Sequence, residues 1–194
     1  MTDYSDLRET PLCDELVFHG SLIDVLRRKV SLPDGRISLR EIVRHPGGAA
    51  VVPVDEDSMV TLVRQHRVAP DLITLEIPAG KLDAPEEDPL MAAQRELAEE
   101  AGLRARHVEW LTTMLPTPGY STERLYLYLA TGLIPCQPHL DADEFVNVVR
   151  MPLQEAVDKV LSGEITDGKT ALALLMARDR LPVCRKELTS PTNM

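Results

Sequence analysis

Residues 88–103 read DPLMAAQRELAEEAGL, and the remaining chain can be interpreted outward from them. The apolar residues of this segment recur at helical spacing and form a single stripe. They are Leu90, Ala93, Leu97 and Ala101. Asp88 can cap a helix, Pro89 suits the first helical position, and Gly102 stands where a helix would stop. The segment therefore predicts a helix from Pro89 to Ala101 with one face against a core.

Three carboxylates share another side of this helix. Glu96, Glu99 and Glu100 stand at positions i, i+3 and i+4, where like charges oppose each other by about 0.2 to 0.5 kcal/mol per pair. One interpretation without a functional role is a solvated acidic face of the helix, with Arg95 as a surface residue. The alternative is a site for a hard divalent cation, because Mg²⁺ prefers oxygen ligands and combines one or two carboxylates with substrate phosphates.

A longer pattern favours the metal site. Residues 80–103 resemble the Nudix box, whose pattern is Gly, five residues, Glu, seven residues, then Arg-Glu-aliphatic-any-Glu-Glu-any-Gly-aliphatic. Every fixed position from Arg95 to Leu103 matches, and seven residues separate Glu87 from Arg95. Six residues instead of five separate Gly80 from Glu87, so we place one extra residue in the loop 81–85, where an insertion costs little. Choosing Glu86 would restore the glycine spacing but lose the arginine spacing.

The resemblance implies a role for each matched residue. Glu96 and Glu100 are expected to bind Mg²⁺, or Mn²⁺ in its place. Glu99 would be a further ligand or a water-activating group. The carbonyl of Ala79 would complete the inner shell, and Arg95 would steady the carboxylates. Metal ions of this kind neutralise phosphate charge and lower the pKa of bound water.

Around the box the chain is mostly β. Short apolar or β-branched runs between turn residues predict strands at 16–19, 22–32, 37–44, 49–54, 59–65, 73–77, 108–115, 125–130 and 145–149. Two further helices are predicted at 153–161 and 169–179. Strands with helices at the middle and end indicate an α/β/α sandwich with a mixed sheet, as the Nudix resemblance also implies. A Rossmann fold is disfavoured because no GxGxxG is present.

We expect three parts: an N-terminal antiparallel β extension at 1–45, a Nudix hydrolase domain at 46–182 and a loose tail at 183–194. Segments outside the box resemble the ADP-ribose pyrophosphatase branch of the family. They are residues 39–47, 62–67 and 75–80, and the likeness covers about residues 16–178. This branch resemblance implies a homodimer in which the N-terminal extension embraces the partner.

The branch resemblance also implies substrate contacts. Arg67 is expected to bind phosphate, which suits a guanidinium fork. Arg40 and Glu41 would lie near the nucleotide. Pro118 stands fifteen residues after Leu103, as the branch requires, although a Pro-Gly pair with Gly119 is by itself only a turn. Glu123 would contact a ribose. These residues are the expected substrate-binding set.

An acidic run between two predicted elements could supply a general base. Glu144 is our first choice, and Asp141 and Asp143 compete with it because the loop alignment is ambiguous. An acidic loop is usually only solvated. With several carboxylates around one metal, their titration would be coupled, and no single pKa belongs to one residue.

The amino-acid composition limits the kinds of molecule that the protein is expected to bind. A formal net charge of −10 argues against nucleic acid as a partner but allows a phosphorylated small molecule held through a cation. The three cysteines, Cys13, Cys136 and Cys184, lie far apart without zinc-site spacing. No run is long and apolar enough for a membrane span, and residues 1–10 do not look like a signal peptide. We expect a cytoplasmic protein without membrane association.

The leading hypothesis is Mg²⁺-dependent hydrolysis of the pyrophosphate of a nucleotide conjugate, with ADP-ribose giving AMP and ribose 5-phosphate. The nearest rival is the same reaction on a GDP-sugar, another ADP-sugar or a dinucleotide. A rival of another class is a Nudix-fold binding module without turnover. Loss of box carboxylates would favour that module, but the sequence retains them.

Overall fold

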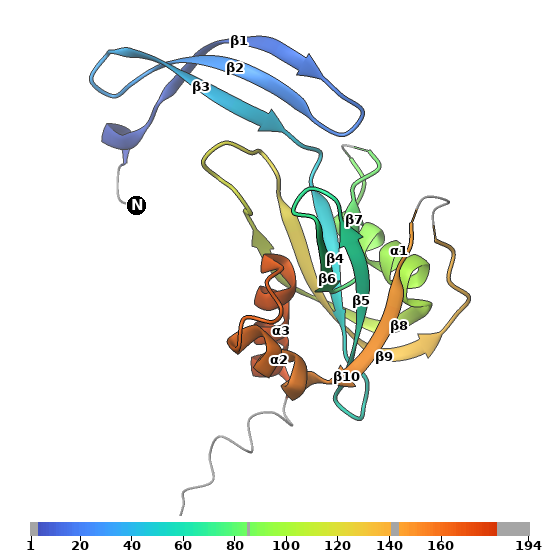
Figure 1. Ribbon diagram of the computed structural model, residues 1–194. Helices are drawn as coiled ribbons and strands as arrows, with labels where there is room; N and C mark the ends of the chain where they lie inside the picture. The colour runs from blue at the N-terminus through green and yellow to red at the C-terminus, as the bar shows by residue number, and fades with distance from the viewer. Residues whose placement is uncertain (1–3, 85, 141–143, 182–194) are drawn as a thin grey trace, which may run out of the picture. The chain divides into compact units, whose positions relative to one another are not determined.

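The structure is a computed structural model that describes residues 4–84, 86–140 and 144–181. Contacts divide the chain into two compact units. The first unit combines residues 1–47 with residues 115–124, and the second combines residues 48–114 with residues 125–194. Figure 1 shows the strands and helices of both units.

The first unit is a three-stranded antiparallel sheet, in agreement with the predicted N-terminal β extension. A short 3-10 turn, η1 (Ser5–Leu7), precedes the strands β1 (Thr10–His19), β2 (Asp24–Ser31) and β3 (Ile37–Arg44), which pair in that order. Residues 115–124 join the end of β3, because Val43 N donates to Tyr120 O and Thr122 N donates to Val43 O. Every residue of β1 is exposed, so this sheet has little core of its own.

The second unit contains two sheets. One orders its strands β7 (Ala79–Lys81), β4 (Gly48–Pro53), β9 (Leu125–Pro135) and β8 (Leu103–Met114). Within it β4 and β9 run parallel, and the other pairs are antiparallel. The other sheet orders β10 (Asn147–Pro152), β5 (Met59–Arg67) and β6 (Leu72–Glu76), all antiparallel. The mixed sheet that the sequence predicts is confirmed.

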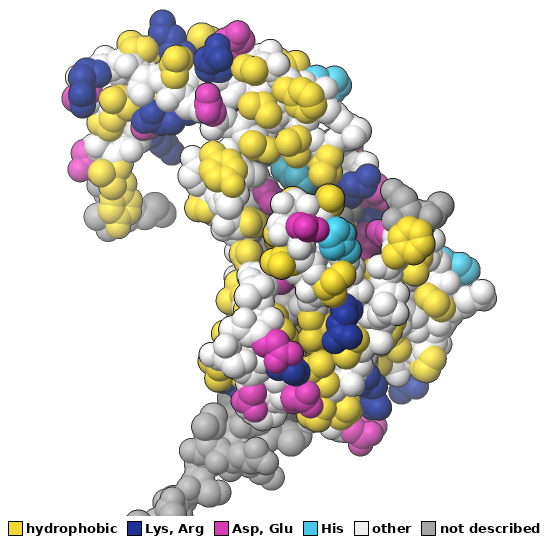
Figure 2. All heavy atoms as spheres, in the orientation of Figure 1, with side chains coloured by type: hydrophobic (Ala, Val, Ile, Leu, Met, Phe, Trp, Pro, Cys, Tyr) yellow, Lys and Arg dark blue, Asp and Glu magenta, His cyan; other side chains and the backbone are white. Residues whose placement is uncertain are grey.

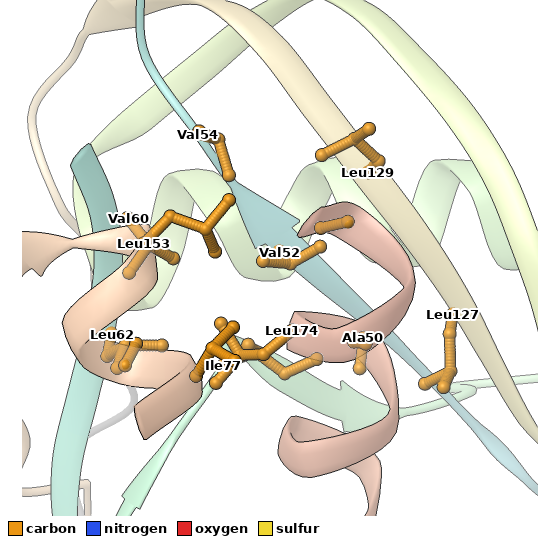
Figure 3. Packing of buried hydrophobic residues seen from close by; sticks show 14 of the residues in the cluster. Ala50, Val52, Val54, Val60, Leu62, Ile77, Leu127, Leu129, Leu153 and Leu174 are labelled. Carbon is orange, nitrogen blue, oxygen red and sulfur yellow. The ribbon is translucent and has the colours of Figure 1, made fainter. Parts of the chain in front are cut away.

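Helices cover both faces of the central strand β4. Its even-numbered residues Ala50 and Val52 join a core with α2 (Leu153–Leu161) and α3 (Gly168–Arg180), shown in Figure 3. Its odd-numbered residues Ala49 and Val51 join a second core with α1 (Pro89–Ala101). Successive side chains of a strand point to opposite faces, so a strand buried on both faces is apolar throughout. The α/β/α arrangement is confirmed.

The ends of α1 follow the prediction. The Asp88 side chain accepts a hydrogen bond from Leu90 N at 2.9 Å, and Pro89 occupies the first turn. At the other end Gly102 adopts a left-handed φ of 63°, and its N–H donates to Ala98 O. This conformation strongly favours glycine. Local capping chemistry therefore fixes the position of the helix that carries the glutamates.

Several strand boundaries differ from the prediction. β1 begins at Thr10 instead of residue 16, and β2 begins at Asp24 instead of residue 22 because Gly20 N bonds to Ile23 O in a turn. β8 begins at Leu103 instead of residue 108, since pairing with β9 extends it through polar residues. The short strand β7 was not predicted. It exists because residues 79–81 pair with β4, a long-range contact that leaves no local pattern.

The predicted domain boundaries at 45/46 and 182/183 stay predictions, and the predicted tail lies outside the described residues. None of the described helices has the length and apolar character that crossing a membrane would require. Cys13 and Cys136 are free thiols, and Cys184 lies outside the described residues.

Candidate active site

The carboxylates of Glu96 and Glu100 are buried where α1 packs on β7, with exposed fractions of 6% and 3%. Ala79 N donates to Glu100 Oε2 at 2.9 Å. The backbone of Gly80 lies so close to Glu96 that an added Cβ would stand 1.9 Å from Glu96 Oε1. Glycine is therefore required at position 80 for the carboxylate to take this place.

Arg95 lies between the carboxylates of the box. Its Nη1 donates to Glu96 Oε1 at 2.7 Å and to Glu99 Oε2 at 3.1 Å, and its Nη2 donates to Lys81 O at 3.2 Å. Glu87 Oε1 lies 3.5 Å from Arg95 Nη2, and Glu87 Oε2 accepts from Asp83 N at 2.6 Å. Glu87 thus joins Arg95 to Asp83, in the loop where we expect the extra residue. The insertion has not removed it from the acidic cluster.

The two buried carboxylates lack sufficient compensating charge. Burial raises the pKa of Glu96 to about 7, and the charges of Glu99 and Glu144 add to the effect of burial while Arg95 opposes it. Burial likewise raises the pKa of Glu100 to about 8, opposed by the Ala79 N–H and reinforced by the charges of Glu96 and Glu144. Near neutral pH the two carboxylates would ionise more readily if a cation lay beside them.

The exposed Glu144 precedes β10, and its charge acts on both Glu96 and Glu100. The sequence singled out Glu144 as the first choice for a general base. Its competitors Asp141 and Asp143 lie outside the described residues. Assignment of the base to Glu144 stays a prediction.

The donor set fits a divalent cation. Within the described part of the chain, no three His, Cys, Asp or Glu side chains already form an arrangement that could hold an ion. Mg²⁺ does not need three, since it commonly combines one or two carboxylates with phosphate oxygens and waters. Two buried glutamates with raised pKa values are donors of that chemistry, and the Ala79 backbone, whose N–H donates to Glu100, adjoins them. Glu99, whose side chain is 35% exposed, stands at the solvent side of the same helix.

Arg67, the predicted phosphate ligand, is half-buried at the end of β5. Its Nε and Nη2 donate to the two oxygens of Glu76, both at 2.7 Å. The charge of Glu100 also acts on Arg67, so the guanidinium lies within electrostatic reach of the acidic helix. The structure thus brings Arg67 into the same unit as the box, although its contact with phosphate stays a prediction.

Sequence reasoning missed two buried residues beside Arg67, namely Glu76 and Lys169. They form an ion pair although they are 93 positions apart. A signal was present for each. Glu76 is a charged residue in the apolar run 73–77, and such a residue needs a partner when it is buried. Lys169 stands in the first turn of a helix, where a positive charge opposes the helix dipole.

The remaining predicted substrate residues belong to the first unit. Arg40 is half-buried, and it donates to Ser38 Oγ at 2.8 Å and pairs with Glu9. Glu41 is exposed on β3. These contacts show what holds Arg40 within the sheet. The predicted nucleotide contacts of both residues stay predictions.

The other three predicted substrate-binding residues lie in the segment 115–124. Pro118 and Gly119 are exposed in a turn. Glu123 is half-buried, with its Oε1 3.8 Å from His45 Nδ1 and its N–H donating to Ser121 Oγ at 3.1 Å. Their roles toward substrate likewise stay predictions.

Replacing Gly80 tests whether the close approach to Glu96 serves metal binding. In Gly80→Ala the new Cβ would displace the Glu96 carboxylate, so we expect the affinity for Mn²⁺ to decrease about 10- to 100-fold. Gly168→Ala is the control, because its Cβ would meet only the Met114 side chain, at 3.6 Å. Calorimetric titration of the metal-free proteins with Mn²⁺ would measure both. Unchanged affinity in Gly80→Ala would contradict the assignment of Glu96.

The raised pKa values predict how stability depends on pH without metal. Glutamates of the unfolded chain ionise near 4.5, whereas Glu96 and Glu100 keep their protons up to about 7 and about 8. The folded state then binds more protons, so the free energy of unfolding should fall as pH rises from about 4.5 to 8. The fall should be shallower in Glu100→Gln. Urea unfolding of both proteins in chelator would show this, and parallel curves would refute it.

Comparison with known proteins places these features in a family. Residues 44–174 match the family described as NUDIX domain. The chain is 39% identical to an ADP-ribose pyrophosphatase of Bacillus subtilis over 170 residues, 87% of this chain and 91% of that protein. It is 38% identical to a methanol dehydrogenase activator of Bacillus methanolicus over 168 residues, 86% and 90% of the two chains. Both likenesses extend over nearly the whole length of these relatives.

Two further likenesses bear on the substrate. A GDP-mannose pyrophosphatase of Cronobacter sakazakii is 34% identical over 145 residues, 70% of this chain and 75% of that protein. A crystal structure of an ADP compounds hydrolase superposes with a TM-score of 0.78 at 27% identity, covering 90% of this chain and 95% of that one. The fold, the intact acidic helix and these matches lead to one conclusion: the chain belongs to the Nudix family and is a Nudix pyrophosphohydrolase.

Proposed function

We propose that this enzyme hydrolyses the diphosphate of ADP-ribose with Mg²⁺, for which Mn²⁺ can substitute. The observation that carries the proposal is the pair of buried glutamates, Glu96 and Glu100, beside the Ala79–Gly80 backbone. The likeness to an ADP-ribose pyrophosphatase over 87% of the chain supports the choice of substrate. The reaction adds water across the diphosphate and yields AMP and ribose 5-phosphate.

The proposed residue roles are those that the family resemblance implies. Glu96, Glu100 and the carbonyl of Ala79 would hold the cation, with Glu99 as a further ligand or water-activating group. When bound, the ion would neutralise phosphate charge and acidify a water. Arg95 holds Glu96 and Glu99 in place through hydrogen bonds. Glu144 would take the proton of the attacking water, and Arg67 would bind the phosphate oxygens.

The bond changes are those of a phosphoryl transfer to water. The water oxygen bonds to one phosphorus, and the bond from that phosphorus to the bridging oxygen breaks. The bridging oxygen leaves with the other phosphate, so both products are phosphomonoesters. The positive charge of Arg67 would stabilise the phosphate oxygens, on which negative charge increases in the transition state.

A substrate panel tests the proposal. Wild type with Mg²⁺ should cleave ADP-ribose in preference to GDP-mannose, other ADP-sugars and dinucleotides. In Glu100→Gln the loss of one buried ligand should reduce kcat on the order of a thousandfold, several kcal/mol of transition-state stabilisation. Glu155→Gln, an exposed glutamate of α2, is the matched control and should keep full activity. Product analysis by anion-exchange chromatography measures all three.

The outcomes separate substrate from mechanism. Preference for GDP-mannose would overturn the substrate and favour the second candidate, which the likeness to a GDP-mannose pyrophosphatase supports. Full turnover by Glu100→Gln would overturn the metal assignment. If wild type cleaves none of the conjugates, the protein is a Nudix-fold binding module without turnover.

We also propose that the enzyme is a cytoplasmic homodimer whose first-unit sheet contacts a second copy. Large hydrophobic side chains are exposed along β1 and β3, including Leu16 at 55% and Leu39 at 58%. Figure 2 shows hydrophobic side chains at the surface of the first unit. A three-stranded sheet needs a buried hydrophobic face for independent stability, and every residue of β1 is exposed. Leu16 lies on the face of Leu26 and Leu39 on the face of Lys29, so both faces of the sheet expose large hydrophobic side chains. Such exposed side chains can mark an interaction site, and a second copy carries the same ones.

Light scattering after size exclusion tests the dimer. Wild type should have twice the chain mass of 21.6 kDa. In Leu16→Glu and Leu39→Glu the introduced charge should shift the mass to that of one chain. Leu161→Glu alters an equally exposed leucine at the end of α2, 69% exposed, and should leave the dimer intact. A wild type of single-chain mass would refute the proposal.

A further inference from the structure

Glu76 is the centre of a buried charge network in the second unit. It is 1% exposed at the end of β6, and both of its oxygens are occupied. Oε1 accepts from Arg67 Nε at 2.7 Å and from Thr74 Oγ1 at 2.6 Å. Oε2 accepts from Arg67 Nη2 at 2.7 Å and from Lys169 Nζ. With four donors on two oxygens, the carboxylate is fixed in one orientation.

Lys169 is an unexpected residue at its position. It is the second residue of α3 and only 9% exposed. A lysine there opposes the helix dipole and incurs a desolvation penalty. Its ammonium pairs with Glu76 and lies 3.1 Å from Asp167 Oδ1. An N-terminal helix cap does not need it, because Asp167 Oδ2 already accepts from Thr170 N at 3.0 Å.

The fixed carboxylate in turn fixes Arg67. Two parallel N–H···O bonds hold the guanidinium in the plane of the Glu76 carboxylate, the geometry that a bidentate pair favours. This fork uses Nε and Nη2, so Nη1 takes no part in it. Arg67 thereby presents one donor edge in a defined direction, and its charge acts on Glu100 of the box.

We propose that Lys169 is a positioning residue that acts through Glu76 to hold the Arg67 guanidinium in place for a diphosphate oxygen. The inference rests on the proposed function, since it takes the phosphate contact of Arg67 from there. Thr74 supports the same carboxylate from its other oxygen. A displacement of about 1 Å in a group that binds the reacting phosphate is enough to slow turnover strongly.

The competing explanation is purely structural. In that case the effect of replacing Lys169 would arise because α3 packs less firmly against β6, independently of Arg67. A double-mutant cycle separates the two, because residues that act through each other are not additive. The variants are Lys169→Met, which keeps the aliphatic length without the charge, Arg67→Gln, and the double variant. The measured quantity is kcat/KM for the conjugate that wild type cleaves best.

We expect Arg67→Gln to reduce kcat/KM about a hundredfold, as the loss of one transition-state donor does, and Lys169→Met to reduce it about tenfold. The double variant should lie within about twofold of Arg67→Gln alone. Multiplication of the two effects would overturn the positioning role. Full activity of the single variant Lys169→Met, together with impaired activity of Arg67→Gln, would also overturn it.

Two further variants guard the interpretation. Lys159→Met removes a partly exposed lysine of α2, 25% exposed, that pairs with Glu164 at 2.8 Å, and it should leave kcat/KM unchanged. Should Lys169→Met fail to fold, Thr74→Val tests the same claim, because it removes the other support of Glu76. Its effect should likewise vanish in the Arg67→Gln background, and an effect that persists there would overturn the proposal.

A readout without substrate separates this inference from the proposed function. In ¹⁵N NMR spectra of wild type, the Arg67 Nε–H should exchange slowly with solvent because Glu76 accepts its hydrogen bond. Lys169→Met should speed that exchange at least about tenfold, and Lys159→Met should not. Unchanged protection would overturn the positioning role whatever the substrate. If protection is lost while Arg67→Gln keeps full activity, the phosphate contact of Arg67 fails, and with it the functional meaning of the fork.

Discussion

Two carboxylates buried against a strand backbone are the constraint around which the second unit is arranged. Glu96 and Glu100 reach their places only because α1 packs on β4 and β7, because Gly80 has no Cβ, and because Ala79 offers an N–H. Each of these conditions involves a different segment of the chain. Burying carboxylates in this way costs stability, and a cation bound to them would recover it.

The pKa values of the buried glutamates in the second unit are shifted in opposite directions. Burial by itself would raise the pKa of Glu76, but hydrogen bonds from Arg67 and the charge of Lys169 outweigh it and hold the pKa at about 2. Around Glu96 and Glu100 burial prevails, and their pKa values rise to about 7 and about 8. The first arrangement is saturated with cationic partners and fixes geometry. The second leaves negative charge available to a metal ion.

Sequence reasoning was most accurate where structure is local. The bounds of α1 and α2 agree with the structure because an apolar stripe, and for α1 also the capping residues, act within a few positions. It was least accurate for β7 and for the first part of β8, which owe their conformation to pairing with β4 and β9. Within the site, Arg95, Glu96, Glu99 and Glu100 followed from one motif, whereas the Glu76–Lys169 pair has no motif to reveal it.

The sequence by itself determined the acidic helix: the spacing of three glutamates, the residues that cap the helix and the glycine that precedes it. These are set by chemistry along a short stretch of backbone, so order along the chain is sufficient. Only the tertiary structure decided which glutamates are buried and which arginine is held by a fork. Burial and ion pairing depend on atoms that are distant in sequence, such as residues 76 and 169, and packing alone brings them into contact.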